Sequence, residues 1–230
     1  MSALTLILIA VFATAAVLEF SLTALYMAQT SDPYKIYPAR PKQLGRIARI
    51  VAPNSIVSGL AVTAMALLGG QWFLHFEAST ALAVLGDALL TLALYDILYY
   101  LLHRYVFHES KLLRGVHILH HTVKFPTAIE SLYVHPAENL LGIATLFVSL
   151  MIVGPISLPA FALILAVYSW LNVVIHSGLD FRHPLLRPIA HMVRNHAHHH
   201  SSMRAGNYAS ITPLPDLLFG TAESPAQLSR

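Results

Sequence analysis

Histidine is the residue type that points most directly to chemistry in this sequence. The chain of 230 residues contains 14 histidines, as many as its lysines and arginines combined. Neutral imidazole is a good ligand for iron, zinc, copper and nickel, so closely spaced histidines predict a metal centre. Three such groups occur: one pair, HxxxxH, and two triplets, HxxHH. They are His103 and His108; His117, His120 and His121; and His196, His199 and His200.

The spacing within these groups indicates how the imidazoles are presented. Residues at i, i+3 and i+4 share one face of an α-helix, so each HxxHH triplet should aim three imidazoles at one region. His103 and His108 lie well off a single stripe, which suits two neighbouring metals or a helix that ends between them. Six or more imidazoles exceed the four ligands of a tetrahedral zinc site. We therefore expect two metal ions.

A simpler interpretation holds for isolated histidines. A lone histidine near a membrane surface is usually an interfacial or hydrogen-bonded core residue, and we assign His75, His183 and His191 to that class. The last group could be taken for an expression tag. Ala197 interrupts the run, however, and thirty residues of ordinary sequence follow it, so we interpret this group as metal ligands as well.

Carboxylates near the histidines are candidate catalytic residues. Asp96 precedes His103 by seven residues, two helical turns, and should face the same way. An ionisable residue inside an apolar span is costly and commonly functional, and a carboxylate that accepts a ligand N–H fixes the orientation of the imidazole. A hydrogen bond to a neighbouring helix is the alternative role for Asp96. We assign catalytic roles to Asp96 and Glu138, with Glu130 a weaker candidate.

The elements that must position these residues are strongly apolar. The chain is 56% hydrophobic and 11% charged, whereas a soluble domain carries about 25% charged residues. Membrane embedding explains the deficit. The absence of cysteine from the sequence excludes thiolate zinc sites, iron–sulfur clusters and disulfides. With a formal charge of +3 and no nucleic-acid motif, we expect no nucleic-acid partner, and one membrane-embedded domain over residues 1–230.

Four apolar stretches are long enough to suggest helices in the membrane, since about 20 residues span the hydrocarbon core. Gly154-Pro155 and Pro159 divide the last stretch, so a re-entrant or tilted hairpin is as plausible there as two full crossings. We expect an all-α polytopic membrane fold whose last segment is a helical hairpin, capped by a cytosolic histidine-rich unit. The stretches are Leu4–Met27, interpreted as a retained anchor, Pro53–Leu74, Thr80–Leu102 and Asn139–Ile175.

The basic residues predict the orientation of these spans. All 14 lysines and arginines, Arg230 included, lie between the first two spans, after the third, or after the hairpin. The connection from Gln71 to Ser79 has none. Because positive residues stay cytoplasmic, all three basic segments should face the cytosol if the hairpin returns to its starting side. We expect a bacterial cytoplasmic membrane or endoplasmic reticulum protein, with His75 alone on the far side.

The ordered motifs resemble a known group of enzymes. Asp96-Ile-Leu-Tyr-Tyr-Leu-Leu-His103-Arg104, with the histidines that follow it, is similar to the sterol desaturase/fatty acid hydroxylase superfamily, membrane-bound oxygenases with histidine boxes. The resemblance extends over roughly Leu85 to Thr221. Later landmarks follow in order: His135-Pro-Ala-Glu138, Ile175-His176-Ser-Gly, His196-Ala-His-His199-His200, Gly206-Asn207-Tyr208 and Leu218-Phe219-Gly220-Thr221.

The resemblance implies a helical membrane protein with two non-haem irons in a catalytic region of about 85–221. Some members have a further histidine at the position of Asn172, and His135 and His198 are additional histidines near the boxes. By the resemblance, the iron ligands are His103, His108, His117, His120, His121, His176, His196, His199 and His200.

The expected activity is O2-dependent hydroxylation or desaturation of a lipid C–H bond in a sterol, fatty acyl or related lipid that enters from the membrane. No haem- or flavin-binding segment is evident, so a separate reductase or small electron carrier should supply electrons. A carotenoid-type hydroxylase would share this chemistry. A metal transporter would need ligands near the bilayer midplane, which only Glu19, Asp87 and Asp96 approach, and a zinc hydrolase lacks an HExxH motif here.

Overall fold

The computed structural model describes residues 1–224, so Arg230 lies outside the described part. This part is predominantly helical, with two strands of two residues each. The α-helices are α1 (Ala3–Met27), α2 (Leu44–Gly69), α3 (Ala81–Leu101), α4 (Arg114–His121), α5 (Pro136–Val153), α6 (Leu158–Ile175), α7 (Arg187–His199) and α8 (Leu214–Leu218). The other elements are β1 (Leu74–His75), β2 (Ile156–Ser157), the 3-10 helices η1 (Gln29–Tyr34), η2 (Gly70–Trp72), η4 (Ala128–Glu130) and η5 (Pro184–Leu186), and the π-helix η3 (Leu102–Glu109).

Five helical segments of the described chain are long and apolar enough to cross a membrane: α1, α2 with η2, α3 with η3, α5 and α6. Large apolar side chains on their outer surfaces, such as Leu60, Leu89 and Ile152, are more than half exposed. Lipid rather than water suits such a surface. The chain is an integral membrane protein, and the all-α polytopic class expected from the sequence is confirmed.

Two helix starts follow the sequence and one does not. Ser2 and Thr80 cap α1 and α3, their hydroxyls accepting the backbone N–H groups of Thr5 and Ala83 at 3.2 Å. The expected start of the second span at Pro53 is wrong, because α2 begins nine residues earlier at Leu44. A proline inside a helix removes one backbone hydrogen bond. Burial of Ile47 and Val51 against Tyr133 offsets that cost.

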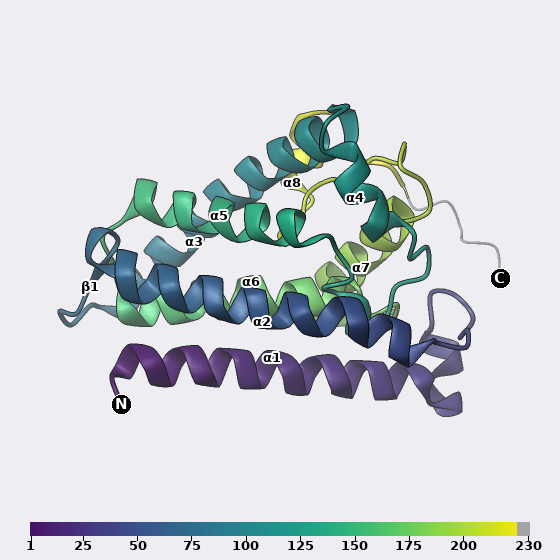
Figure 1. The fold of residues 1–230 in the computed structure, drawn as a ribbon, viewed down its shortest axis with the longest axis horizontal. Helices are drawn as coiled ribbons and strands as arrows, with labels where there is room; N and C mark the ends of the chain where they lie inside the picture. The colour runs from purple at the N-terminus through teal and green to yellow at the C-terminus, as the bar shows by residue number, and fades with distance from the viewer. Residues whose placement is uncertain (225–230) are drawn as a thin grey trace.

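The last apolar stretch is the expected helical hairpin. The helices α5 and α6 have 18 residues each, about 27 Å of helix, which approaches the thickness of the hydrocarbon core. Their turn contains β2, which pairs in parallel with β1, Leu74 opposite Ile156. The long helices lie side by side in Figure 1, with β1 at one end and α4, α7 and α8 at the other. The hairpin therefore returns the chain to the end where α3 finishes.

This arrangement gathers three chain segments at one end of the helices. Ile36 donates to the carbonyl of Gly178 at 2.9 Å, so the segment after α1 joins the segment after α6. The segment that carries α4 contacts η3 and α5. These are the segments that contain the histidine groups and most of the basic residues, whereas His75 lies in β1 at the opposite end. We call this end the histidine end.

Candidate metal centre

The nine histidines proposed as ligands come together in two clusters within the described residues. In each cluster, every residue offers a ligand atom within 4.8 Å of those of the others. All nine side chains are buried, with at most 8% exposure. The five-histidine cluster contains His103, His108, His117, His121 and His199, and the four-histidine cluster contains His120, His176, His196 and His200.

Each HxxHH triplet serves both clusters. On α4, His117 and His121, four residues apart, belong to the five-histidine cluster, while His120 belongs to the other. In the second triplet the assignment is reversed, so that His199 joins the five-histidine cluster, and His196 and His200 join the four-histidine cluster. Around the helix axis, the side chain at i+4 points to one side of the side chain at i, and the side chain at i+3 points to its other side. A triplet therefore aims at two adjacent sites, not at one as expected.

The HxxxxH pair lies on the π-helix η3, which continues α3 without a break. Hydrogen bonds from i to i+5 characterise a π-helix, an uncommon element frequent at functional sites. His103 and His108 are therefore neighbours along its axis, with ring centroids 5.0 Å apart, and both belong to the five-histidine cluster. The expected helix end between the two histidines is wrong, because η3 runs through both of them.

Outward hydrogen bonds fix the orientation of most of these imidazoles. In seven of the nine, Nδ1 contacts an oxygen that can only accept, so Nδ1 carries the proton and Nε2 keeps its lone pair. His117 donates to Glu138 Oε1 at 2.8 Å. The other six donate to backbone carbonyls: His103 to Tyr208 (2.7 Å), His108 to Met203 (3.0 Å), His120 to Tyr133 (3.4 Å), His176 to Asn172 (2.6 Å), His199 to Gly206 (2.8 Å) and His200 to Val123 (2.9 Å).

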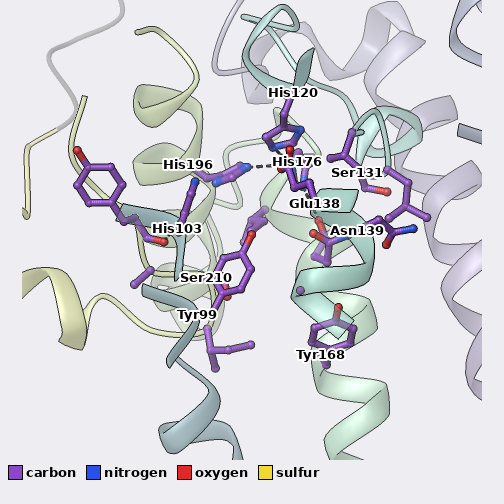
Figure 2. A pocket seen from close by; sticks show the side chains of 18 of the residues that line it. Tyr99, His103, His120, Ser131, Glu138, Asn139, Tyr168, His176, His196 and Ser210 are labelled. Carbon is purple, nitrogen blue, oxygen red and sulfur yellow. Dashed lines mark hydrogen bonds between the residues drawn. The ribbon is translucent and has the colours of Figure 1, made fainter. Parts of the chain in front are cut away.

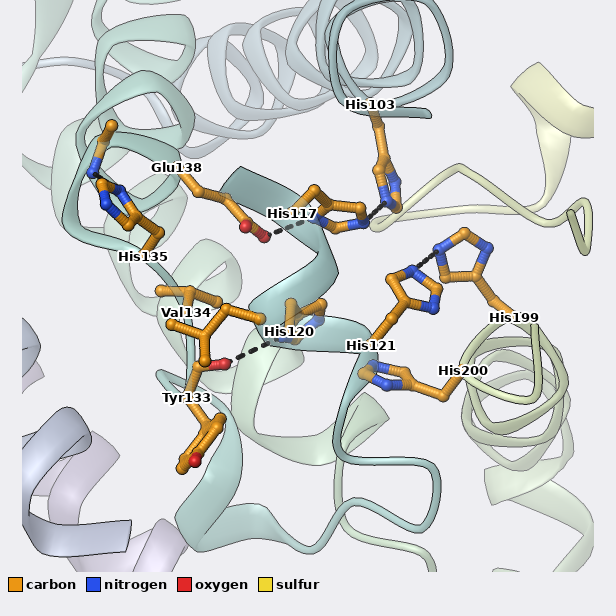
Figure 3. A network of polar contacts seen from close by, with 12 residues as sticks. His103, His117, His120, His121, Tyr133, Val134, His135, Glu138, His199 and His200 are labelled. Atoms are coloured by element: carbon orange, nitrogen blue, oxygen red, sulfur yellow. Dashed lines mark hydrogen bonds and ion pairs between the residues drawn. The ribbon is translucent and has the colours of Figure 1, made fainter. Parts of the chain in front are cut away.

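The inward nitrogens fit bound cations. Nε2 of His103 and Nε2 of His117 lie 3.0 Å apart, and those of His120 and His176 lie 3.4 Å apart. Since each ring already has its proton on Nδ1, two lone pairs face each other in both pairs. Nε2 of His108 is buried without a hydrogen-bond partner among the described residues. A metal ion that accepts these lone pairs would remove the repulsion. Figure 3 shows this chain of contacts from Glu138 through His117 to His103.

For the histidines that lie outside the membrane helices, burial favours the neutral imidazole, which is the form that binds a metal. Desolvation lowers the pKa of His117, His120, His196 and His200 well below the usual value, and neighbouring imidazoles lower it further. Burial lowers the pKa of His176 to about 4, although the hydrogen bond to the Asn172 carbonyl opposes this shift. These imidazoles are therefore neutral at pH 7, as metal ligation requires.

The two candidate catalytic carboxylates occupy different places. Glu138, at the start of α5, contacts His117 through Oε1, and its buried Oε2 has no hydrogen-bond partner in the described residues. Asp96 does not contact a histidine ring nitrogen. Its carboxylate accepts the backbone N–H groups of Ser210, Ile211 and Thr212 at 2.9–3.2 Å, and the Thr212 hydroxyl at 2.7 Å.

Asp96 therefore reaches the five-histidine cluster only through the backbone. It holds residues 210–212, just after Tyr208, whose carbonyl accepts the Nδ1 proton of His103. Asp216, which sequence reasoning missed, supports the same segment by accepting the backbone N–H groups of Tyr208 and Ala209 at 2.8 and 2.9 Å. Its nearness in sequence to the Gly206-Asn207-Tyr208 landmark is the signal that could have found it.

Several other candidate residues lie outside both clusters. Glu130 accepts the backbone N–H and hydroxyl of Thr127 and pairs with Lys42 at 2.5 Å, so it stabilises the turn after α4. His135 caps α5, and His198 pairs with Glu223 at 2.8 Å. Asn172 contributes its backbone carbonyl to His176.

One cavity opens onto both clusters, and we call it the histidine cavity. From the clusters it is lined by His103, His120, His176 and His196. Figure 2 shows these histidines on one side and Ser131, Asn139 and Tyr168 on the other. Tyr95 and Tyr99 of α3 and Gly142 of α5 form further parts of the wall. An apolar molecule reaching this end of the helices would thus meet both clusters.

Comparisons with known proteins agree on one family. The family model described as fatty acid hydroxylase matches residues 88–221, more than half of the chain. Similar proteins include methylsterol monooxygenase 1 of Rattus norvegicus, 28% identical over 55% of this chain and 43% of its own length. A very-long-chain aldehyde decarbonylase of Oryza sativa subsp. indica is 33% identical over 60% of this chain and 53% of its own length.

An ornithine lipid hydroxylase of Rhizobium tropici is 31% identical over 69% of this chain and 45% of its own length. The chain thus spans about half the length of these relatives. No solved structure matches the chain. The matched residues include all nine clustered histidines, Asp96 and Glu138, and leave out α1 and α2.

Proposed function

Because this chain belongs to the fatty acid hydroxylase family, we propose that it is a membrane-bound non-haem di-iron oxygenase that hydroxylates or desaturates a lipid C–H bond. O2 is the co-substrate, and a separate reductase or electron carrier supplies electrons. The observation that carries the proposal is the pair of adjacent imidazole clusters facing one cavity at the ends of membrane helices. Five and four neutral nitrogen ligands suit two irons better than one zinc.

The proposed division of labour follows from the contacts. The two clusters would each hold one iron, and when bound the irons supply O2-dependent oxidation of an unactivated carbon. Glu138 orients His117 and brings the carboxylate charge nearest to the imidazoles. Tyr95, Tyr99 and Tyr168 give the histidine cavity an aromatic wall that holds an apolar chain and excludes water.

A lipid substrate is supported by the position of the histidine cavity and by the relatives. Their names specify a methylsterol, a very-long-chain aldehyde and an ornithine lipid as the molecules they act on. These share long apolar parts that a membrane dissolves. Access from the bilayer would let such a molecule reach the clusters while its tail stays among apolar side chains.

Lipid profiling tests this function directly. Cells that express the chain under air should accumulate lipids shifted by +16 or −2 mass units, and cells that express Gly142→Leu should not. Gly142 lines the histidine cavity, and a Cβ there would already lie 3.6 Å from Tyr99 and 3.9 Å from the Tyr168 hydroxyl. A leucine side chain would therefore fill the space that the lipid needs, and we expect at least a tenfold loss of product.

Gly142→Ala is the matched control. Its single methyl group makes only ordinary contacts and removes a glycine from the interior of a helix, so most of the product should persist. Both variants should retain iron, because Gly142 contacts no histidine in either cluster. Equal product from the wild type and Gly142→Leu would contradict the assignment of this cavity, and no O2-dependent product from the wild type would contradict the function.

We also propose that the histidine end faces the cytosol, because the segments at this end carry the basic residues. The cysteine-free sequence makes labelling of single introduced cysteines unambiguous. In intact cells, a membrane-impermeant maleimide should label Ala78→Cys but neither Leu112→Cys nor Leu185→Cys, all three positions being exposed. After permeabilisation all three should react. Labelling of Leu185→Cys in intact cells would refute the orientation.

A further inference from the structure

Glu19 is an acidic residue in a membrane helix that the proposed chemistry does not use. It lies in α1, at the seventeenth of 25 positions, and is half-buried. Within residues 1–224, no hydrogen bond or ion pair to its carboxylate is present. An ionisable group in a span is costly unless it has a partner or a function. The surroundings of Glu19 therefore indicate what that partner is.

Glu19 lines a second cavity of about 260 Å³ between α1, α2, α5 and α6, which we call the Glu19 cavity. Toward the middle of the helices its wall is apolar and includes Phe12 and Leu165. Nearer the histidine end the wall becomes polar, because α1 and α6 run toward that end and α5 begins there. The polar lining residues there include Glu19, Ser55, Asn139, Ser169 and Asn172.

The Glu19 cavity adjoins the histidine cavity. The two cavities share part of their walls, so a molecule in one is separated from the other by a single layer of side chains. Figure 2 shows three of the shared residues, Ser131, Asn139 and Tyr168, on the side of the histidine cavity away from His103. The full shared set is Ser131, Leu132, Asn139, Tyr168 and Asn172.

We propose that the Glu19 cavity binds the substrate lipid by a hydrogen-bond donor, a hydroxyl or an N–H group, that donates to the Glu19 carboxylate. This inference rests on the proposed oxygenase function and specifies its substrate class. When ionised, the Glu19 carboxylate only accepts hydrogen bonds, and a hydrogen bond to an ionised acceptor is about twice as strong as a neutral one. The ionised carboxylate repels anionic headgroups, and lipids that have only esters or ethers leave it unpartnered.

The order of the wall residues also predicts which carbon reacts. The polar groups lie toward the histidine end and the apolar groups toward the middle of the membrane. A bound lipid therefore has its tail in the membrane and its donor group beside the histidine cavity, so the oxidised carbon is near the donor group and not at the far end of the tail. Glu19 and Ser55 precede the residues that match the family model.

A binding experiment with two probes tests this inference without iron or O2. The full-length protein in lipid nanodiscs is titrated at pH 9, at which the Glu19 carboxyl is ionised, with 1-octadecanol or octadecyl methyl ether, which differ in the hydroxyl donor. Binding is followed by the rise in unfolding temperature with ligand concentration. Wild type should bind the alcohol roughly tenfold more tightly than the ether, and Glu19→Leu should bind both equally. Comparing variants in the same nanodiscs cancels differences in membrane partitioning.

Asp87→Leu is the matched control. Asp87 is another acidic residue in a membrane helix, and its side chain lines neither cavity. It should keep the wild-type preference. If Glu19→Leu does not fold, Glu19→Gln tests the same point, with an expected preference below that of wild type. Equal binding of both probes by wild type, or an undiminished preference without the Glu19 carboxylate, would overturn the inference. The oxygenase proposal would stand in either case, since iron and turnover do not enter this measurement.

Discussion

His120→Ala is expected to lower the iron content of the purified protein from about two to about one per chain. His120 is one of only four imidazoles in its cluster, and its Nε2 faces that of His176 at 3.4 Å. Three remaining ligands in a buried site bind iron far more weakly, while the five-histidine cluster keeps its full set. Because C–H oxidation is proposed to need both irons, product formation should fall at least a hundredfold. Elemental analysis and lipid product analysis measure the two effects.

His198→Ala provides the matched control in the same protein. His198 lies between His196 and His199 in sequence but outside both clusters, where it pairs with Glu223. This variant should keep about two irons and most of its product. Full iron content and full activity in His120→Ala would contradict the proposal that the four-histidine cluster binds an iron. Equal losses in the two variants would show that the substitutions act through general destabilisation.

Glu138→Gln is expected to weaken iron binding by about 10- to 100-fold, the usual effect of losing an outer partner of a metal ligand. Glu138 Oε1 accepts the Nδ1 proton of His117 at 2.8 Å, and both side chains are buried. Glutamine can still accept this hydrogen bond but carries no negative charge, so the loss isolates the contribution of the charge. Glu138→Leu removes both and should weaken binding further. Competition with a chelator measures the affinity without any substrate.

Glu130→Gln separates this effect from a general loss of a buried carboxylate. Glu130 is as buried as Glu138, but its partners are Thr127 and Lys42, and it contacts no histidine. We expect Glu130→Gln to lower the unfolding temperature and to leave iron affinity unchanged. Unaltered affinity in Glu138→Gln would mean that the hydrogen bond, and not the charge, supports His117. Unaltered affinity in Glu138→Leu as well would exclude Glu138 from the metal centre.

The two clusters depend on segments that no single helix could organise. The ring centroids of His103 and His199 lie 4.7 Å apart although the two residues belong to η3 and α7, on either side of the hairpin. Five of the six carbonyl groups that orient the rings come from the segment after α4 and from residues 203–208. Metal affinity should therefore be sensitive to changes in these segments even where no ligand is replaced.

The sequence by itself determined the residue types and the membrane fold. Metal coordination needs particular side chains at close spacing, and apolar length is a local property, so both are readable without a structure. The motifs singled out eight histidines and the family resemblance added His176, and the structure gathers all nine. The helical hairpin was also predictable, because Gly154-Pro155 interrupts a stretch too long for one helix.

Only the tertiary structure decided how those side chains are used. The division of each HxxHH triplet between two clusters depends on which helices face α4 and α7, and helical periodicity alone does not contain that information. The carbonyl acceptors leave no trace in residue type, because every residue has one. The carbonyl that orients His103 belongs to a residue 105 positions away. Asp96 looked like a partner of His103 along one helix, yet it binds the backbone of residues 210–212, because the returning chain offers N–H groups there.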